Sequence, residues 1–455
     1  MKMTPRFNAL ILGEFSFIAL FVLVAQSTRL LSHHLGLTSP LFILIVLGLP
    51  IAFAWRLSYP EVLSKSVLIV PGLALAALPF LWFNISVFTF ITNTPTYFEF
   101  SQFMKGWAIE AMLFSSFILF WLSGCRSPFI LIFAIVFSCL FGGVVVTLQE
   151  FGLVGQLYGK TDFEYLTFDP VAKYQNMYGE LKFRNGGISG NWHDAANFIS
   201  IGVFACLASC FNLTQLRERA TFGLVAFFLT VAVALTQSRA SLLVLLVAIA
   251  LWSCFRIWMF LQRSQIQVVT HRIKIGAVLI ALMLVGALLA SSLSTRIMLF
   301  STTGPLSDGS RLQSLLDSYT FLFSEKWLMA LGFGFGSSGA AVVSGNQIYP
   351  VNLVDFVSVI TLAQYGLAGF LIKILLFSGM LVLLFNVFKS SNASPNQANV
   401  GRKIIAETGM LMLIAILLSF LVGEFALNRG FLAVFGCVYA ILCNLTKDQV
   451  FDDEK

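Results

Sequence analysis

The stretch from Phe129 to Leu148 reads FILIFAIVFSCLFGGVVVTL and contains no charged residue. A transmembrane helix needs about 20 consecutive apolar residues to cross the hydrocarbon core of a bilayer, and this stretch has that length. Runs of the same kind recur along the whole chain of 455 residues. The sequence therefore predicts an all-α, polytopic integral membrane protein.

The composition of the chain excludes a soluble protein. Hydrophobic residues make up 58% and charged residues only 11%, against roughly 45–50% and 25% in soluble globular proteins. The net charge of +7 would suggest nucleic acid as a partner of a soluble protein. Here the basic residues mostly lie in short loops between apolar runs, where they set the topology. We expect a lipid bilayer around the chain and no nucleic acid as a partner.

The apolar runs predict about 12 spans in a single membrane domain covering residues 1–455. The first run follows basic residues as a signal peptide would, but Leu23 and Ala25 form a poor cleavage site, so we expect an uncleaved span. Three spans follow residue 351 and end near Leu445. The nine before it are Ala9 to Ala25, Leu35 to Trp55, Val67 to Ile91, Trp107 to Leu122, Phe129 to Leu148, Ala195 to Leu213, Phe222 to Leu235, Leu242 to Leu261, and Ile275 to Leu293.

The stretch from Asn352 to Phe385 is too long for one span, because its 34 residues as a helix would reach about 50 Å, and the hydrocarbon core is about 30 Å thick. It is either two short spans or one span with an external lead-in helix. Only the second arrangement places the basic loop at 389–403 inside the cell. We therefore expect Asn352 to Tyr365 at the outer surface or partly inserted, and a span from about Gly366 to Phe388.

Basic residues in short loops predict the orientation of the chain. With both termini in the cytoplasm, most of these residues fall inside, among them Arg217, Arg219 and Arg256. Two long polar segments, Gln149 to Asp194 and Ser294 to Val351, then form large loops outside the membrane. In a protein whose other connections are short, long loops on one face are where function is expected.

Arg239 is the sharpest candidate for a functional residue. Thr236-Gln-Ser-Arg-Ala-Ser241 joins two apolar helices with almost no loop, so the guanidinium lies at the membrane boundary near the start of a helix. A helix N-terminus adds partial positive charge and free N–H donors, which suits a phosphate. The alternative is an arginine that only reaches to lipid headgroups.

Two residues are candidates for a general base. Asp355 lies in an otherwise apolar stretch, where it is either a carboxylate near the bilayer surface or the polar face of a helix exposed to water. His193 is the other candidate, because imidazole titrates near neutrality. However, Asn191-Trp-His-Asp194 opens a helix, where Asn and Asp are also ordinary capping residues.

Other features of the chain carry weaker signals. Gly332-Phe-Gly-Phe-Gly336 lacks the Lys-Ser/Thr of a nucleotide-binding loop, so its glycines are better explained by tight turns and close approach of neighbouring segments. The seven cysteines lie in or at the ends of apolar runs without a CxxC pair, and we expect neither disulfides nor a metal site. Lys373, Glu14 and Glu110 lie singly within apolar runs, and the sequence assigns them no partner.

The order of these pieces resembles the bacterial O-antigen ligase and polymerase superfamily. The resemblance extends from about Phe183 to Leu371. Each motif alone is weak, but they follow one another in the right order on the predicted outer face. The motifs are Arg184-Asn-Gly-Gly187 with Asn191 and Ala195 to Asn197, then Thr236 to Ser241, then Gly309-Ser-Arg311 with Gly332-Phe-Gly334, then Asp355 ahead of Gln364-Tyr-Gly-Leu-Ala-Gly369.

The resemblance implies inverting glycosyl transfer, without metal or other cofactor, from an undecaprenyl-pyrophosphate-linked oligosaccharide at the outer leaflet of a bacterial inner membrane. Arg184, Arg239 and Arg311 would bind the pyrophosphate and stabilise it as the leaving group. Asp355 or His193 would remove the proton from the acceptor hydroxyl. A chain-length regulator and a flippase of the same pathway are the implied protein partners. Supporting positions are Gly332, Gly334, Asp194 and Arg429.

Three functions remain open at this point. In the ligases a histidine followed by asparagine stands where this chain has Asp355-Phe356, which favours a polymerase of repeat units. The first alternative is a ligase that transfers finished polymer to a lipid core or a protein. The second is a transporter or flippase, a class that usually has inverted repeats, broken helices and ionisable residues near mid-membrane.

Overall fold

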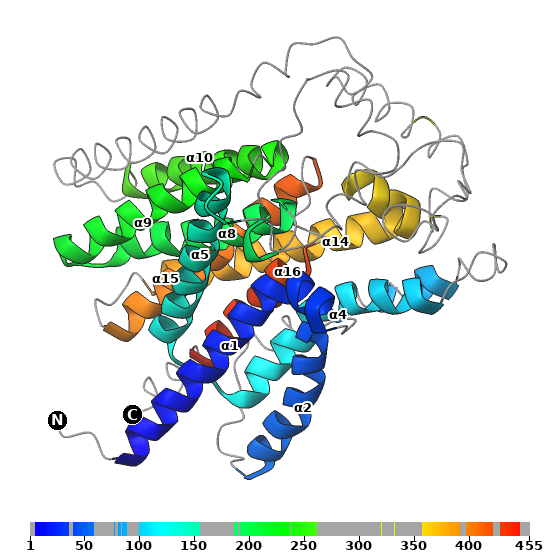
Figure 1. The fold of residues 1–455 in the computed structure, drawn as a ribbon, viewed down its shortest axis with the longest axis horizontal. Helices are drawn as coiled ribbons and strands as arrows, with labels where there is room; N and C mark the ends of the chain where they lie inside the picture. The colour runs from blue at the N-terminus through cyan, green and yellow to red at the C-terminus, as the bar shows by residue number, and fades with distance from the viewer. Residues whose placement is uncertain are drawn as a thin grey trace. The chain divides into compact units, whose positions relative to one another are not determined.

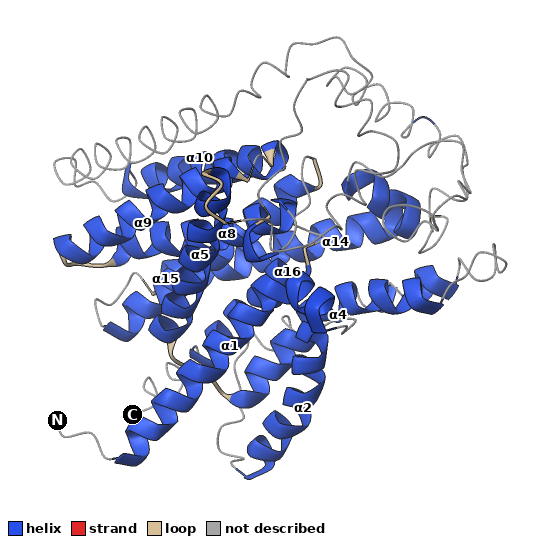
Figure 2. Cartoon of the chain, viewed as in Figure 1, coloured by secondary structure: helices blue, strands red, loops and turns tan. Residues whose placement is uncertain are grey.

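The described part of the chain is helical (Figure 1, Figure 2). The computed structural model describes residues 5–35, 40–58, 77, 81–82, 84–88, 100–154, 186–189, 192–236, 238–261, 320, 332, 357–391, 397–421 and 428–445. The helices are α1 Pro5–Leu35, α2 Pro40–Ser58, α4 Phe100–Ser123, α5 Pro128–Glu150, the short 3-10 helix η3 Gly187–Ser189, α8 Trp192–Asn212, α9 Leu216–Leu235, α10 Arg239–Leu261, α14 Val357–Ser390, α15 Gln397–Ser419 and α16 Arg429–Leu445.

Five segments of these helices are long and apolar enough to cross a membrane: Pro128–Glu150, Trp192–Asn212, Leu216–Leu235, Ala240–Ile257 and Thr361–Ser390. Shorter apolar helical segments are Gly13–Thr28, Pro40–Ala54, Ala111–Ser123 and Arg429–Leu445. The chain is thus a multi-pass membrane protein, as its composition predicts. The predicted span from Ile275 to Leu293, most of that from Val67 to Ile91 and most of both long polar segments lie outside the described residues.

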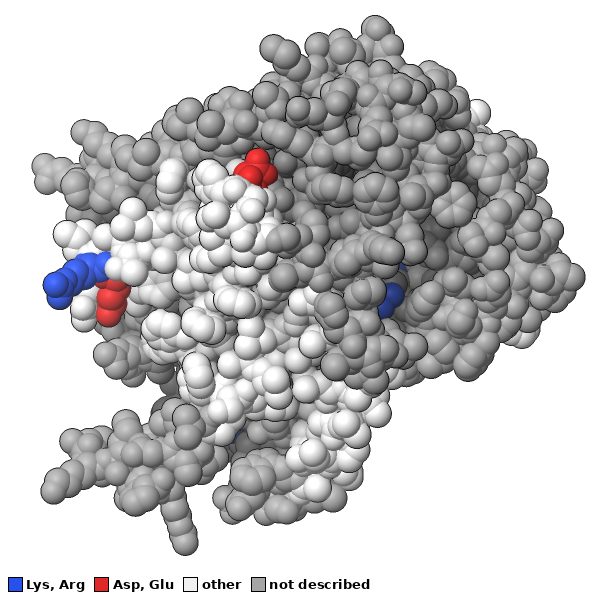
Figure 3. All heavy atoms as spheres, in the orientation of Figure 1, with Lys and Arg blue, Asp and Glu red and all other residues white. Residues whose placement is uncertain are grey.

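The uncharged stretch from Phe129 to Leu148 lies within α5. Its large apolar side chains Phe129, Phe133, Phe137 and Phe141 are exposed at a spacing of four residues, which places them on one face of the helix. In water such a face would be unfavourable, but in a bilayer it contacts lipid. Figure 3 shows the same character on its visible face, where few of the described side chains are charged.

The helix α14 breaks at the residue where the sequence predicts that the span begins. Gly366 has φ 65° and ψ −177° inside the helix Val357–Ser390, a backbone conformation that favours glycine. The candidate span Thr361–Ser390 begins before the break, so it takes in the last residues of the predicted lead-in helix. The location of the lead-in helix at the outer surface stays a prediction.

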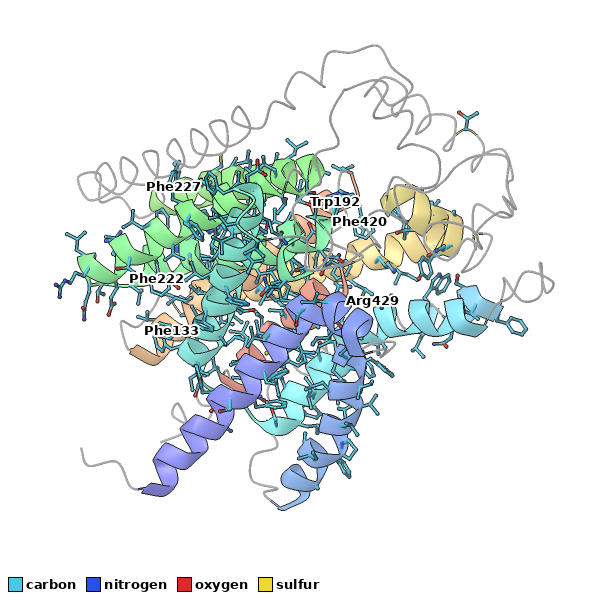
Figure 4. All side chains as sticks on the ribbon, in the orientation of Figure 1. Phe133, Trp192, Phe222, Phe227, Phe420 and Arg429 are labelled. Carbon is cyan, nitrogen blue, oxygen red and sulfur yellow. The ribbon has the colours of Figure 1, made fainter. Side chains whose placement is uncertain are left out.

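The chain divides into two compact units, 1–44 with 129–294 and 45–128 with 295–455. In the first unit, α8 packs against α9, and α10 packs against both (Figure 1). The helix α1 contacts η3 and α8. Phe133 of α5 and Phe222 of α9 have ring centroids 6.4 Å apart (Figure 4). The hydroxyl of Ser138 on α5 donates to Gln26 Oε1 of α1 at 2.6 Å. The core of this unit is therefore built around α8, whose residues 195–210 are all buried.

In the second unit, α4 packs against α16, and α15 packs against α14 and α16. Asn444 near the end of α16 donates to the carbonyl oxygens of Phe120 and Cys125, each at 3.1 Å. Phe420 makes an edge-on contact with Phe370 at 5.7 Å between centroids. The hydrogen bond between Asn444 and Phe120 joins residues that are 324 positions apart in the sequence.

Candidate functional site at the α9–α10 turn

Short connections join α8 to α9 and α9 to α10, so that consecutive helices run in opposite directions. Residues 213–215 connect α8 to α9, and residues 236–238 connect α9 to α10. The N-terminus of α8 therefore lies at the same end as the turn between α9 and α10. At the opposite end, Arg219 Nε donates to the Cys210 carbonyl at 3.0 Å, and Arg256 Nη2 donates to Asn212 Oδ1 at 3.3 Å. The predicted cytoplasmic arginines and Arg239 thus lie at opposite ends of these helices.

The glycine-rich end of the first long polar segment packs directly before α8. The backbone N–H of Gly187 donates to Gln149 Oε1 of α5 at 2.9 Å. Gly187 has φ 54°, and a Cβ added there would lie 2.9 Å from Val146 Cγ2 and 3.4 Å from the Gly142 carbonyl oxygen. Any larger residue would be strained and crowded at this position. The glycine lets the segment approach α5 and lead into α8.

His193 of α8 contacts the turn that carries Arg239. Its Nδ1 lies 2.8 Å from Ser238 Oγ, and the Ser238 hydroxyl donates to Ser241 Oγ at 2.8 Å. Ser238 and Ser241 are almost fully buried, whereas His193 is half-buried. The described backbone places Arg239 at the first position of α10, directly after Ser238. The structure therefore brings the predicted histidine and the predicted phosphate-binding turn together.

The turn is held by its own side chains as well. Thr236 Oγ1 accepts the N–H of Ser238 at 3.3 Å and donates to the Val233 carbonyl at 2.7 Å. The N–H of Leu242 donates to the Ser238 carbonyl at 3.0 Å, which makes Ser238 the N-cap residue of α10. A turn with this many internal hydrogen bonds holds its polar groups in one arrangement before any ligand arrives.

A buried amide lies one helical turn after His193. Asn197 is fully buried, and among the described residues neither its Oδ1 nor its Nδ2 has a hydrogen-bond partner. Residues four apart lie on the same face of a helix, so Asn197 follows His193 along α8. Buried polar groups without partners are uncommon. An amide both donates and accepts, which suits a hydroxyl-bearing ligand. Trp192, at the start of α8, has its ring centroid 5.4 Å from that of His193.

The other predicted site residues divide between described and undescribed positions. Asp194 is half-buried in the first turn of α8, where an acidic residue is favourable for the helix dipole. Arg429 is the first residue of α16 (Figure 4). It follows Asn428, whose Oδ1 accepts the N–H of Phe431 at 2.7 Å. Outside the described residues lie Arg184, Arg311, Gly334 and Asp355.

Gly332 belongs to a second group of contacting residues, which surrounds the break in α14. It has φ 77°, and a Cβ added there would lie 2.5 Å from the Gly366 nitrogen and 2.9 Å from the Ala363 carbonyl oxygen. The close approach that the sequence predicts for this glycine is thus confirmed. Trp82 Nε1 donates to the Tyr365 carbonyl at 3.1 Å, and Ser86 Oγ donates to the Gln364 carbonyl at 2.5 Å. These donors bind carbonyl groups next to the break, which a continuous helix would use internally.

Lys373 also belongs to this group, although the sequence alone assigned it no partner. It is only 8% exposed, and its Nζ lies 4.1 Å from the ring centroid of Tyr365, within the range of a cation–π interaction. A lysine near the middle of an apolar run was the available signal. Its partner was not predictable, because the break at Gly366 lies between the two residues.

No protein-family model matches the sequence, and no curated protein matches it significantly. Among the described side chains, no group of three or more His, Cys, Asp and Glu residues is arranged to hold a metal ion. The relation to the O-antigen ligase and polymerase superfamily stays a resemblance of motifs.

Proposed function

We propose that the chain polymerises lipid-linked oligosaccharide repeat units of a bacterial surface polysaccharide. In this proposal it is an inner-membrane protein of about 12 spans with both termini in the cytoplasm. It is a metal-independent inverting glycosyltransferase that acts at the outer leaflet on an undecaprenyl-pyrophosphate-linked donor. The acceptor is the end of another lipid-linked unit, so the growing chain moves to a new anchor and the old pyrophosphate is released.

One observation carries this proposal: the hydrogen bond between His193 and Ser238 joins a titratable group to the turn that contains Arg239. A transfer from a pyrophosphate-linked sugar needs a proton acceptor close to a cation that stabilises the leaving group. Arg239 begins α10, so the dipole of that helix adds to its positive charge. The buried amide of Asn197, one turn along α8, offers a donor and an acceptor for a sugar hydroxyl.

In the proposed reaction, the acceptor hydroxyl attacks the anomeric carbon from the face opposite the pyrophosphate. A new C–O bond forms, the bond between the anomeric carbon and the pyrophosphate oxygen breaks, and the hydroxyl proton passes to His193. The electron pair leaves with the pyrophosphate, whose charge Arg239 stabilises together with Arg184 and Arg311. Asp355 is the second candidate for the base.

The decisive test is polymerisation by membranes that contain the protein and lipid-linked repeat units alone. Arg239→Ala is expected to lower the rate by about 10²-fold or more, the size of effect seen when a preorganised charge-stabilising group is removed. Arg217→Ala is the matched control, because Arg217 is an exposed arginine at the other end of α9. Equal activity of the Arg239 variant and the wild type, at equal protein level, would contradict the proposal.

The same assay separates the polymerase from the ligase. A ladder of longer lipid-linked products without any added core acceptor supports the polymerase. Product that forms only after a lipid core or protein acceptor is added supports the ligase instead.

One observation favours the alternative of a transporter or flippase. The broken helix α14, with buried Lys373 near its middle, has two of the features that transporters use at their binding sites. If the purified protein, reconstituted into vesicles, moved a fluorescent lipid-linked oligosaccharide between leaflets without lengthening it, transport would replace polymerisation as the proposed function.

A further inference from the structure

We propose that Arg219 and Arg256 form a binding site for an anionic phospholipid, recognised by the phosphate of its headgroup. The site lies where α8 ends, α9 begins and α10 ends, at the opposite end of these helices from the turn that carries Arg239. In the proposed topology the lipid belongs to the cytoplasmic leaflet. The inference does not rest on the proposed enzymatic function.

The side chain of Arg219 is held by one of its nitrogens and presents the other two. Its Nε donates to the Cys210 carbonyl at 3.0 Å, and it makes no other hydrogen bond within the described part of the chain. A guanidinium has five N–H donors, and four of them belong to the two terminal nitrogens. These nitrogens form a fork that matches two phosphate oxygens. Because the bond to Cys210 already orients the fork, binding costs less side-chain entropy.

Arg256 brings a second positive charge to the last turn of α8. Its Nη2 donates to Asn212 Oδ1 at 3.3 Å, and its Cζ lies 5.6 Å from the ring centroid of Trp252, within the range of a cation–π interaction. The amide of Asn212 is itself fixed, because Nδ2 donates to the Ala208 carbonyl at 2.8 Å. Asn212 and Cys210 are two residues apart, so both arginines are attached to the same end of α8.

Capping of α8 is the alternative explanation for these contacts, because cations are favourable near the C-terminus of a helix. Capping accounts for the two hydrogen bonds to α8, but it leaves this end of the helices positive. The described residues there are three arginines, Arg217, Arg219 and Arg256, against one carboxylate, Glu218, which gives a net charge of +2. Basic residues between transmembrane helices at the membrane surface bind anionic headgroups.

Apolar side chains beside the arginines favour a phospholipid over a free phosphate ion. Leu216 in the first turn of α9 and Ile257 next to Arg256 are both exposed, and so is Leu224, about two turns further along α9. In a bilayer, such side chains contact acyl chains. A phospholipid can therefore contact the arginines with its phosphate and the leucines with its chains, whereas an inorganic phosphate gains nothing from the apolar surface.

The test measures lipid binding by the full-length protein, purified in a neutral detergent. The probes are phosphatidylglycerol, which is anionic, phosphatidylcholine, whose phosphate is balanced by a cation, and inorganic phosphate. Native mass spectrometry measures the affinity, and the unfolding temperature gives a second readout, because a ligand of the folded state raises it. We expect the wild type to bind phosphatidylglycerol about 10-fold or more tightly than phosphatidylcholine.

The variants distinguish a built site from general attraction to a basic surface. Arg219→Gln removes the fork and should weaken the binding of phosphatidylglycerol by about 10-fold or more, as expected for lost hydrogen bonds to a charged group. Arg217→Gln is the matched control. It removes the same charge two residues away, from an exposed side chain, and should bind phosphatidylglycerol as the wild type does. Arg219→Lys keeps the charge but loses the fork, so it should also bind more weakly than the wild type.

Equal weakening in Arg217→Gln and Arg219→Gln would overturn the inference, and so would wild-type affinity in Arg219→Gln. If Arg219→Gln does not fold, Arg219→Lys decides, and wild-type affinity in that variant would overturn the inference. Stabilisation by inorganic phosphate as strong as that by phosphatidylglycerol would exclude a phospholipid as the ligand. These measurements use no lipid-linked oligosaccharide. A protein that binds phosphatidylglycerol through Arg219 but forms no polymer would therefore count against the proposed function alone.

Discussion

At the residue scale, a single carbon added at Gly332 should have a large effect on stability. Alanine at this position meets backbone atoms of Gly366 and Ala363 and must also adopt φ 77°. We expect Gly332→Ala to lower the free energy of unfolding by more than the 1–2 kcal/mol or so that a left-handed conformation alone costs a non-glycine residue. Thermal unfolding of the purified protein measures the difference.

The matched control is Gly152→Ala. Gly152 has a similar φ of 70°, but nothing lies within 4 Å of a Cβ added there. The control variant carries the conformational cost without the crowding. Equal losses of thermal stability in the two variants would show that the approach of Gly332 to the break in α14 contributes nothing.

At the element scale, the packing of α16 on α4 depends on Gly436. A Cβ added there would contact Ser116 Oγ and would lie 2.7 Å from the Leu113 carbonyl oxygen and 3.0 Å from the Phe117 nitrogen. Small residues let transmembrane helices approach closely, and the backbone of α4 cannot move aside as a side chain can. We expect Gly436→Ala to lower the unfolding temperature. Gly13→Ala in α1, where a Cβ would meet nothing within 4 Å, should leave it unchanged or raise it slightly. An unchanged unfolding temperature in Gly436→Ala would contradict this account of the α4–α16 contact.

At the scale of the whole molecule, the distribution of arginines predicts the orientation in the membrane. Leu153 follows the C-terminal end of α5, and Glu218 lies in the first turn of α9, at its N-terminal end. Both residues are exposed. With exposed Cys254 replaced by serine, an impermeant maleimide should label Leu153→Cys in intact cells. It should label Glu218→Cys only after the membrane is permeabilised, because basic residues near Glu218 favour the cytoplasm. The reverse pattern of labelling would contradict the proposed topology. It would place His193 and the turn between α9 and α10 inside the cell.

Sequence and structure agree most closely where the bilayer itself imposes the length of an element. The run from Phe129 to Leu148 became α5, Pro128–Glu150, and α16 ends at Leu445 as predicted. Agreement is poorer at helix ends in water, where hydropathy carries no signal. The helix α9 begins at Leu216, six residues before the predicted Phe222, because its charged first turn is helical too.

Charge predicted that a span begins at about Gly366, but it predicted neither the break in α14 at that residue nor the surroundings of the break. Trp82 and Ser86, which donate to the carbonyls beside the break, are 283 and 278 residues away from their partners. No local pattern marks a tryptophan or a serine as the donor for a distant carbonyl. The same holds for Ser238, which the sequence presented only as a neighbour of Arg239.

The sequence by itself determined that this protein crosses the membrane repeatedly and that its arginines are divided between the ends of α8, α9 and α10. Both properties follow from hydrophobicity, length and charge, which can be read along the chain. Only the tertiary structure decided that His193 meets Ser238, 45 residues further on. That contact depends on how α8 and α10 pack against each other, and packing is a property of the folded helices together.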